Sequence, residues 1–384
     1  MYIHNRYGRK KSMLLNNIIV LVACLFVILS YCTQVFYLLV VVRFLIGINC
    51  GIFTGLSPLY ITEVAPVNLR GALGVFHQMG IVTAILFSNI MGMENIFGSS
   101  TKWHLLLCVP LFFSAIQVIL FLFCPESPAF LIKRNKEEEA MNALCWLRRT
   151  NDVNVEMESL SKGKTEIRSN DITIVQLIRS KRLRSALIVA VVMQLSQQLS
   201  GINAVFNFSG QMFKDAGMSA GASQTLTSCL GAVNVVFCAI SIPLMEKAGR
   251  RFLHLFGLGG IACCSFVLTI TLQYSKSSKP AAVTAIIAIM LFVVFFQSGP
   301  GSIPWFITSE IFATESRSAA ISIAGLVNWS GNFLVCIAYL PLAELIGGWV
   351  FFIFTVLLVA FWLFTFMRVP ETKGKTIEEI TALF

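Results

Sequence analysis

The side chains in this sequence that are best suited to bind a ligand are amides that lie within long apolar stretches. A polar side chain in such a stretch is costly unless it faces a cavity or a partner. Each amide offers hydrogen-bond donors and an acceptor, which matches the hydroxyl groups of a neutral polyol. The alternative is that these amides only bond neighbouring helices to one another. The amides in question are Gln78, Gln194, Gln197, Gln198, Asn203, Asn207, Asn234, Gln297, Asn328 and Asn332.

Carboxylates show the opposite distribution. All 19 Asp and Glu residues fall in polar segments or near the ends of apolar stretches. A membrane-buried carboxylate usually marks a proton or cation path, so this distribution argues against such a path in this part of the protein. The four His residues lack metal-ligand spacing, and the sequence has no nucleophile–base pair or Gly-rich phosphate loop. We therefore expect no enzyme, no metal and no cofactor.

One segment beside the amides cannot hold a regular helix. In the run 298–305 two prolines remove backbone donors and two glycines loosen the turn. A kink beside a polar site suits a moving gate, and a static packing kink is the alternative. Trp305, at the end of the run, could stack on the apolar face of a ring-shaped ligand or only fill space. The residues expected to form this gate are Gly299, Pro300, Gly301 and Pro304.

The elements that must position these residues are helices long enough to cross a membrane. Of the 384 residues 56% are hydrophobic and only 12% are charged, whereas a soluble protein carries about 25% charged residues. This composition excludes a soluble enzyme, a disordered chain and a secreted disulfide scaffold. About ten stretches reach the roughly 20 residues that a helix needs to span a bilayer. They are residues 12–30, 36–54, 73–93, 105–123, 186–208, 224–245, 252–274, 281–307, 319–342 and 349–367.

The net charge of +10 is not a nucleic-acid signal, because the basic residues are dispersed along one face of the spans. The side poor in basic residues holds Lys102, Lys214, Lys276 and Lys279, and Arg43 lies inside a span. All other Lys and Arg residues lie on the basic side, either at the ends of the spans or in the polar segment 126–184. An excess of Lys and Arg marks the cytoplasmic side. We expect cytoplasmic N- and C-termini, a lipid bilayer around the spans and no nucleic-acid partner.

Several short motifs occur twice, at nearly the same offset along the chain. NRYGRK at 5–10 matches EKAGRR at 246–251, TEVAPVNLR at 62–70 matches SEIFATESR at 309–317, and PESPAF from Pro125 matches PETKGK from Pro370. The chain is thus predicted to form two parallel halves, the architecture of major-facilitator transporters. Two spans precede the first motif in the second half and almost nothing precedes it in the first half. We therefore expect the chain to lack the first two of twelve helices.

The repeated motifs place acidic and basic residues at the cytoplasmic ends of the spans. Ion pairs there could hold the inner side shut and separate when it opens. Each such pair at a wet interface contributes only about 0–1 kcal/mol, which suits a switch that must cycle, and a role in topology alone is the alternative. The residues expected to form this switch are Arg9, Lys10, Arg43, Glu63, Arg70, Glu246, Arg250, Arg251, Glu310 and Arg317.

A series of motifs carries a resemblance to a known family, in order from Asn5 to Phe384. The motifs are GRKKSM, RFLIGINCG, EVAPVNLRGALG, HQMGIV, PESP, QLSQQLSGINAVF, EKAGRR, GPGSIPWF, NWSGNF and PETKGKT. Together they resemble the sugar porters, and specifically the GLUT-type facilitative glucose transporters of animals. The resemblance implies the major-facilitator fold, a sugar site between the halves, and alternating access without energy coupling.

Motif position within this family implies particular roles for individual residues. The QLS signature at 194–196 goes with a preference for glucose over fructose, and the residues at the outer gate are Asn207 and Phe208. The short helices of the central segment would form an intracellular helical domain, and the family implies the plasma membrane. The implied sugar contacts are Gln78, Gln197, Gln198, Asn203, Asn234, Gln297, Trp305 and Asn328.

The chain departs from the family pattern at four points. Gln297 stands where the family commonly has Glu, which removes a charge and keeps hydrogen bonding. Asn207 and Phe208 replace two tyrosines, so the usual aromatic outer gate is altered. Ala129 replaces a cytoplasmic arginine in the PESP motif. The two expected helices that are missing would normally line the cavity.

The sequence therefore predicts an all-α membrane protein with the major-facilitator fold of two parallel six-helix halves, with about ten of twelve helices present. Residues 1–125 would form the N-terminal half, 126–183 a cytoplasmic linker with short helices, 184–370 the C-terminal half and 371–384 a tail. The expected function is facilitative uniport of a hexose, glucose first among them. The alternatives are a proton-coupled sugar symporter, with its carboxylate on a preceding helix, and a truncated non-transporting sugar sensor or regulatory isoform.

Overall fold

The structure is a computed structural model of the chain. It describes residues 7–66, 70–150, 152–158, 160, 172–275, 278–312, 314–373, 375 and 379. At 70–75, 181, 182, 246, 314 and 315 it describes the backbone but not the side chains. These residues form helices joined mostly by short connections, and none of them lies in a strand. The fold is therefore all-α, as the sequence predicts.

The chain divides into two compact units, each with its own packing. Unit 1 comprises residues 1–80 and 90–169, and unit 2 comprises residues 81–89 and 170–384. Helix α4 (Arg70–Met91) is divided between them. The functional domain boundaries predicted from the repeat, at 125, 183 and 370, stay predictions.

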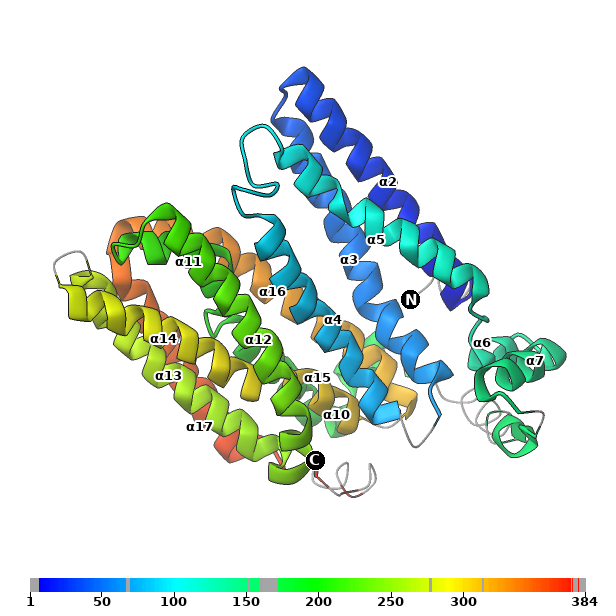
Figure 1. Cartoon of the computed structure of the whole chain (residues 1–384). Coiled ribbons are helices and arrows are strands. Elements are labelled where there is room, and N and C mark those ends of the chain that lie inside the picture. The colour runs from blue at the N-terminus through cyan, green and yellow to red at the C-terminus, as the bar shows by residue number, and fades with distance from the viewer. Residues whose placement is uncertain are drawn as a thin grey trace. The chain divides into compact units, whose positions relative to one another are not determined.

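Unit 1 is built around one long helix that packs on two others. Helix α2 (Arg9–Thr33) packs against α3 (Tyr37–Val64) and α5 (Trp103–Phe123) (Figure 1). Two short helices follow, α6 (Pro128–Lys133) and α7 (Glu137–Arg148). Both lie in the segment 126–183 for which the sequence predicts short helices, and α7 begins with three consecutive glutamates, which suit the positive end of a helix dipole.

Two buried amides tie α2 to α3. Asn16 Nδ2 donates to the backbone oxygen of Asn49 at 3.0 Å, and Asn49 Nδ2 donates to the backbone oxygen of Asn16 at 2.9 Å. Both side chains are buried. This reciprocal pair is an example of amides that join membrane helices to one another, the alternative that the sequence leaves open for every amide in a span.

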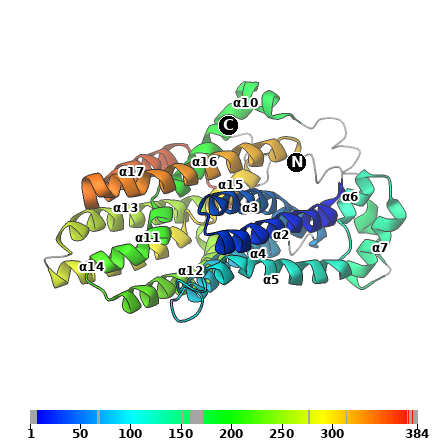
Figure 2. The ribbon, with the colours of Figure 1, turned by 90° about the horizontal axis from the view of Figure 1, so that it is seen from above.

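Unit 2 contains the remaining helices. They are α9 (Ile174–Arg179), α10 (Lys181–Gln198), α11 (Ile202–Asp215), α12 (Ala220–Ala248), α13 (Arg250–Tyr274), α14 (Lys279–Ser298), α15 (Ile303–Glu310), α16 (Thr314–Ile346), the 3₁₀ turn η2 (Gly347–Trp349) and α17 (Val350–Arg368). Helix α13 packs against both α14 and α17 and lies between them in both views (Figures 1 and 2). Helix α10 packs mainly against α16.

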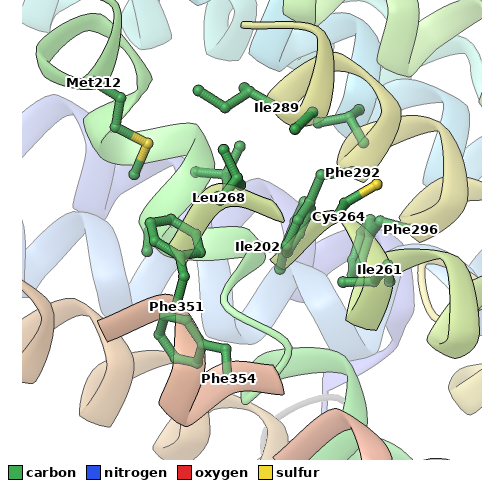
Figure 3. Packing of buried hydrophobic residues seen from close by; sticks show 14 of the residues in the cluster. Ile202, Met212, Ile261, Cys264, Leu268, Ile289, Phe292, Phe296, Phe351 and Phe354 are labelled. Atoms are coloured by element: carbon green, nitrogen blue, oxygen red, sulfur yellow. The ribbon is translucent and has the colours of Figure 1, made fainter. Parts of the chain in front are cut away.

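The apolar core of unit 2 lies next to its two helix breaks. Ile202 at the start of α11, Phe296 near the end of α14 and Phe354 of α17 all belong to one buried cluster (Figure 3). Phe292 and Phe351 of this cluster are fully buried. Burying a Phe side chain stabilises packing by about 1.5–3 kcal/mol in water. Within a membrane, where lipid is as apolar as the core, close packing takes over this role.

Among the described residues, eight helical segments are long and apolar enough to cross a membrane. One of them, residues 316–368, contains the last two predicted spans, and Phe76–Met91 is a shorter apolar helix. Every predicted span therefore falls on an apolar helix of the structure. The predicted spans 186–208 and 281–307 are each broken into two helices, at Leu199–Gly201 and at Gly299–Ser302.

The outward faces of these helices are apolar. Phe44 of α3, Phe123 of α5 and Leu326 of α16 are each at least 70% exposed. Exposed apolar surface of this extent marks a site of contact in a soluble protein, and along whole spanning helices it is the surface that faces lipid.

Candidate functional site

A break between α10 and α11 sets the direction of the amides on both sides of it. Gly201 adopts φ of 91°, a left-handed conformation that favours glycine. A Cβ at this position would lie 2.7 Å from Phe354 Cδ2, so no larger residue fits here without a shift of that ring. Ser200 Oγ donates to the Gln197 carbonyl at 2.7 Å and accepts from Ile202 N at 3.3 Å, which closes the turn. The apolar stretch is therefore interrupted at Leu199–Gly201.

Five amides around this break hydrogen-bond to one another. Asn328 Nδ2 of α16 donates to Gln194 Oε1 at 2.7 Å and to Gln197 Oε1 at 2.6 Å. Asn328 Oδ1 accepts from Gln198 Nε2 at 2.8 Å. Asn203 Nδ2, beyond the break, donates to Gln198 Oε1 at 2.5 Å. We call Gln194, Gln197, Gln198, Asn203 and Asn328 the amide cluster.

The amide cluster carries no formal charge, and four of its five side chains are buried, with Asn203 half-buried. Gln194 is 0% exposed, Gln197 5% and Asn328 2%. An unpaired buried polar group costs about 1–3 kcal/mol, and the cluster avoids most of this cost by internal pairing. Gln194 Nε2 has no hydrogen-bond partner among the described residues. The cluster thus offers donors and acceptors for a neutral solute.

Unit 2 has two further buried amides, Asn234 of α12 and Gln297 of α14, which we call the second polar group without implying that they touch. Each side chain is 1% exposed. Apart from the Cys238 thiol beside Gln297, the described residues provide no hydrogen-bond partner for Gln297 Nε2, Gln297 Oε1 or Asn234 Oδ1. Buried polar atoms without a partner are rare in folded proteins, so these three atoms represent hydrogen-bonding capacity that a ligand can use.

The second break, between α14 and α15, lies against the amide cluster. Gln197 Nε2 donates to the carbonyl oxygens of Pro300 at 2.8 Å and Gly301 at 2.7 Å. A Cβ on Gly257 of α13 would lie 2.6 Å from Pro300 Cδ, so α13 approaches the break from another side. The irregular backbone predicted for this run is confirmed, and its movement as a gate stays a prediction. Trp305 lies half-buried in the first turn of α15.

The polar network continues from the amide cluster towards residue 207. Asn332 Nδ2 reaches Gln198 Oε1 at 3.4 Å, and the Cys336 thiol lies 3.7 Å from Asn332 Oδ1 and 3.4 Å from Asn207 Nδ2. The neighbouring Phe208 stacks on Tyr339 with ring centroids 4.8 Å apart. Asn207 and Phe208 therefore both contact α16, and their role as an outer gate stays a prediction. Gln78 lies on the part of α4 that belongs to unit 1, and its place in the site stays a prediction too.

In unit 1 three segments meet at the start of α2. Arg9 makes a two-pronged ion pair with Glu63, with distances of 2.8 Å from Nε and 2.7 Å from Nη2. Glu126 Oε1 accepts from the backbone N–H groups of Arg9 at 2.9 Å and Lys10 at 3.0 Å. Ser127 Oγ donates to Glu63 Oε2 at 2.5 Å. A carboxylate at a helix N-terminus is favourable, because unpaired backbone donors and the helix dipole converge there.

Unit 2 repeats this arrangement at the start of α13. Glu371 accepts from the backbone N–H groups of Arg250 at 2.9 Å and Arg251 at 3.1 Å. Arg250 Nη2 lies 3.3 Å from Glu310 Oε1, and Thr372 Oγ1 donates to Glu310 Oε2 at 2.5 Å. The repeated motifs therefore fold into two similar networks, and these bonds join residues of the same unit.

The other predicted switch residues have different partners or lie outside the description. Lys10 Nζ donates to the Cys124 carbonyl at 2.7 Å, and Arg251 Nη2 donates to the Phe366 carbonyl at 2.5 Å. Arg317 Nε donates to the Phe312 carbonyl at 3.3 Å. Arg43 is exposed on α3. The side chains that lie outside the described residues are those of Arg70 and Glu246.

Four residues of these networks are absent from the predicted switch. They are Glu126, Ser127, Glu371 and Thr372, and they cap the helices or bond to the paired glutamates. The signal was present in the sequence, because PESP and PETK match at nearly the offset of the other motifs. Their chemical role was not apparent because a capping carboxylate more than 100 residues from the helix leaves no local pattern.

Buried neutral amides on broken apolar helices, in a chain with many membrane-spanning segments, define a multi-pass membrane transporter. Residues 1–384 match the sugar (and other) transporter family, so this chain belongs to that family. Transporters of this family are not enzymes.

Curated relatives and solved structures agree with this family. The chain is 44% identical over 382 residues to the solute carrier family 2 facilitated glucose transporter member 1 of Gallus gallus, covering 99% of this chain and 78% of the relative. It is 42% identical to member 3 of Oryctolagus cuniculus, covering 99% and 77%. The fold resembles the major-facilitator proton:xylose symporter XylE bound to 6-bromo-6-deoxy-D-glucose, with a TM-score of 0.79 at 24% identity over 100% of this chain and 84% of that one. It also resembles a partially occluded inward-open XylE from E. coli, with a TM-score of 0.81 at 23% identity over 98% and 84%. The major-facilitator fold is thereby confirmed.

Proposed function

We propose that the protein transports a hexose, with glucose as the preferred substrate, by facilitated uniport. The observation that carries this proposal is the amide cluster, a buried set of neutral donors and acceptors beside two helix breaks. Such groups replace the water around sugar hydroxyls without placing a charge inside the membrane. The relatives named as facilitated glucose transporters support glucose as the substrate.

The proposed site combines the amide cluster with the second polar group. Gln297 and Asn234 offer unpaired buried atoms, whereas the amides of the cluster would exchange bonds with one another for bonds to the sugar. Trp305 would stack on the ring of the sugar. The proposed sugar contacts are Gln78, Gln197, Gln198, Asn203, Asn234, Gln297, Trp305 and Asn328.

The two cytoplasmic networks are the proposed conformational switch. Each joins a helix N-terminus to two acidic side chains through bonds of 2.5–3.3 Å. Arg9, Glu63, Arg250 and Glu310 would hold the inner ends of the helices together in one state and separate in another. The protein would lie in the plasma membrane, with the N-terminal half, linker, C-terminal half and tail arranged as predicted and with both termini in the cytoplasm.

Uptake into proteoliposomes tests the proposed function. The chain would be reconstituted, and saturable entry of radiolabelled D-glucose would be compared with entry of L-glucose. We expect stereoselective uptake and accelerated exchange when the vesicles are preloaded with unlabelled D-glucose. Equal rates for the two enantiomers would contradict the proposal.

A proton gradient separates uniport from symport in the same vesicles. For a uniporter, we expect that an inward proton gradient leaves the final glucose concentration inside the vesicles equal to the concentration outside. Accumulation above equilibrium that a protonophore abolishes would establish the proton-coupled alternative. Glucose binding without flux would establish the non-transporting sensor.

A further inference from the structure

Two backbone carbonyls at the α14–α15 break lack the donor that a helix would supply. In an α-helix the carbonyl of residue i accepts from the N–H of residue i+4. For Pro300 that residue is Pro304, which has no N–H. For Gly301 it is Trp305, whose N–H instead bonds to the Ser302 carbonyl at 3.2 Å. The Pro300 and Gly301 carbonyls are buried with their residues, so each needs a donor from elsewhere.

The side chain of Gln197 supplies both donors. Its Nε2 bonds to the Pro300 carbonyl at 2.8 Å and to the Gly301 carbonyl at 2.7 Å. An amide nitrogen carries two hydrogens, so this atom is fully used. The opposite orientation of the amide would set Oε1 against two carbonyl oxygens, which can only accept. The break itself therefore fixes which end of Gln197 faces it.

The other end of the same amide is also fully used. Gln197 Oε1 accepts from Asn328 Nδ2 at 2.6 Å and from Gln198 Nε2 at 3.2 Å. All the hydrogen-bonding positions of Gln197 are thus occupied by protein groups. A sugar hydroxyl that bonds to Gln197 must displace one of these partners.

We propose that Gln197 is a positioning residue that latches the α14–α15 break and releases it when sugar binds. Its amide replaces the N–H that Pro304 lacks, and competition from a sugar hydroxyl frees the carbonyls of Pro300 and Gly301. The backbone at Gly299–Ser302 then moves more readily. Binding of sugar is thereby coupled to movement of the proposed gate at this break. The sugar-dependent step rests on the proposed function, whereas the latch in the sugar-free protein does not.

A double-mutant cycle with Pro304 tests the latch directly. Amide hydrogen exchange of the peptide 299–307 would be followed in the full chain in lipid nanodiscs without sugar. Gln197→Ala removes both donors, and we expect exchange about tenfold faster. Pro304→Ala restores an N–H at the position that the Pro300 carbonyl needs. Adding Gln197→Ala to this variant is expected to speed exchange less than threefold.

Asn203→Ala is the matched control, because Asn203 belongs to the amide cluster and bonds to Gln198 rather than to the break. We expect it to leave the exchange of 299–307 unchanged. An equal effect of Gln197→Ala with and without Pro304→Ala would overturn the latch. If Gln197→Ala alone fails to fold, the double variant must restore folding, and failure to do so would overturn it equally.

Addition of D-glucose tests the coupling of the latch to sugar. We expect D-glucose, and not L-glucose, to speed exchange of 299–307 in the natural protein and to have no further effect on Gln197→Ala. If Gln197→Ala speeds exchange less in the Pro304→Ala background, as expected, but D-glucose has no effect, the latch is kept and its release by sugar is rejected. If Gln197→Ala has the same effect in both backgrounds while glucose flux is saturable, the proposed function is kept and the latch is rejected.

Discussion

At the scale of single residues, the proposed sugar site depends on how many hydrogen-bond partners each amide already has within the protein. Asn328 uses both hydrogens of Nδ2 and accepts through Oδ1 from a third amide. Gln297 lies at the other extreme, with both of its polar side-chain atoms lacking a nitrogen or oxygen partner among the described residues. The first pattern is that of a residue that holds its neighbours in place, and the second is that of a residue available to a ligand.

Replacement of Asn328 tests its role in holding the amide cluster together. Asn328→Ala leaves Gln194 Oε1 and Gln198 Nε2 without their bonds of 2.7 and 2.8 Å. We expect a loss of about 1–3 kcal/mol in stability and weaker glucose binding, measured by thermal unfolding in detergent and by equilibrium binding. Asn332→Ala is the control, because its bond to Gln198 is long at 3.4 Å. An equal loss in the two variants would show that Asn328 has no special role.

At the scale of elements, the two helix breaks and the two capped N-termini are the features that differ from plain membrane spans. Helices α2 and α13 each begin after a glycine with positive φ, 96° at Gly8 and 90° at Gly249. In each case the capping carboxylate occupies the space that a side chain on the glycine would need. A Cβ on Gly8 would collide with the Glu126 carboxylate, and a Cβ on Gly249 would lie 2.6 Å from Glu371 Oε2. The GR motif therefore needs its glycine so that a distant glutamate can reach the helix N-terminus.

Replacement of Gly8 tests this requirement. An Ala at φ of 96° is strained by about 1–2 kcal/mol, and its Cβ would also displace the Glu126 carboxylate from α2. We expect Gly8→Ala to lower the temperature of unfolding in detergent. Gly55→Ala in the middle of α3 is the control, because a Cβ there meets nothing within 4 Å, and it should be neutral or stabilising by up to about 1 kcal/mol. Equal melting temperatures for Gly8→Ala and the natural protein would refute the explanation.

At the scale of the whole molecule, the charge distribution predicts the orientation in the membrane. Both networks lie beside the segments that carry the excess of Lys and Arg, and many of these basic residues have local partners. Lys10, Arg250 and Arg251, for example, bond to carbonyls or carboxylates at helix ends. The basic residues, which are predicted to orient the protein, therefore also bond to groups at the ends of its helices.

Epitope tags test the predicted orientation. A tag joined to the C-terminus is expected to be hidden from antibody in intact cells and revealed by detergent. A tag inserted at 99–101, in the turn before α5, is expected to be labelled in intact cells. The reverse pattern would contradict the positive-inside argument.

The extent to which the site could be predicted varies from residue to residue. The amides of the cluster, the irregular run at Gly299–Pro304 and the paired motifs are recognisable in the sequence, because polar, Gly and Pro residues stand out among apolar ones. The capping roles of Glu126 and Glu371 were not, since the acceptor and the helix that it caps are 116–121 residues apart. The partners of Gln197 lie 103 and 104 residues away, and no local pattern identifies them.

The sequence by itself determined the apolar spans and the doubled motifs, and it supplied the predicted sidedness of the basic residues and the amides proposed to bind a neutral sugar. These properties follow from hydrophobicity, charge and residue type, which act locally along the chain. Only the tertiary structure decided how each polar group is used, because a hydrogen bond depends on direction and distance between segments far apart in sequence. It assigned the two donors of Gln197 to the carbonyls that Pro304 and Trp305 leave without a helical partner, and it paired Arg9 with Glu63 and Arg250 with Glu310.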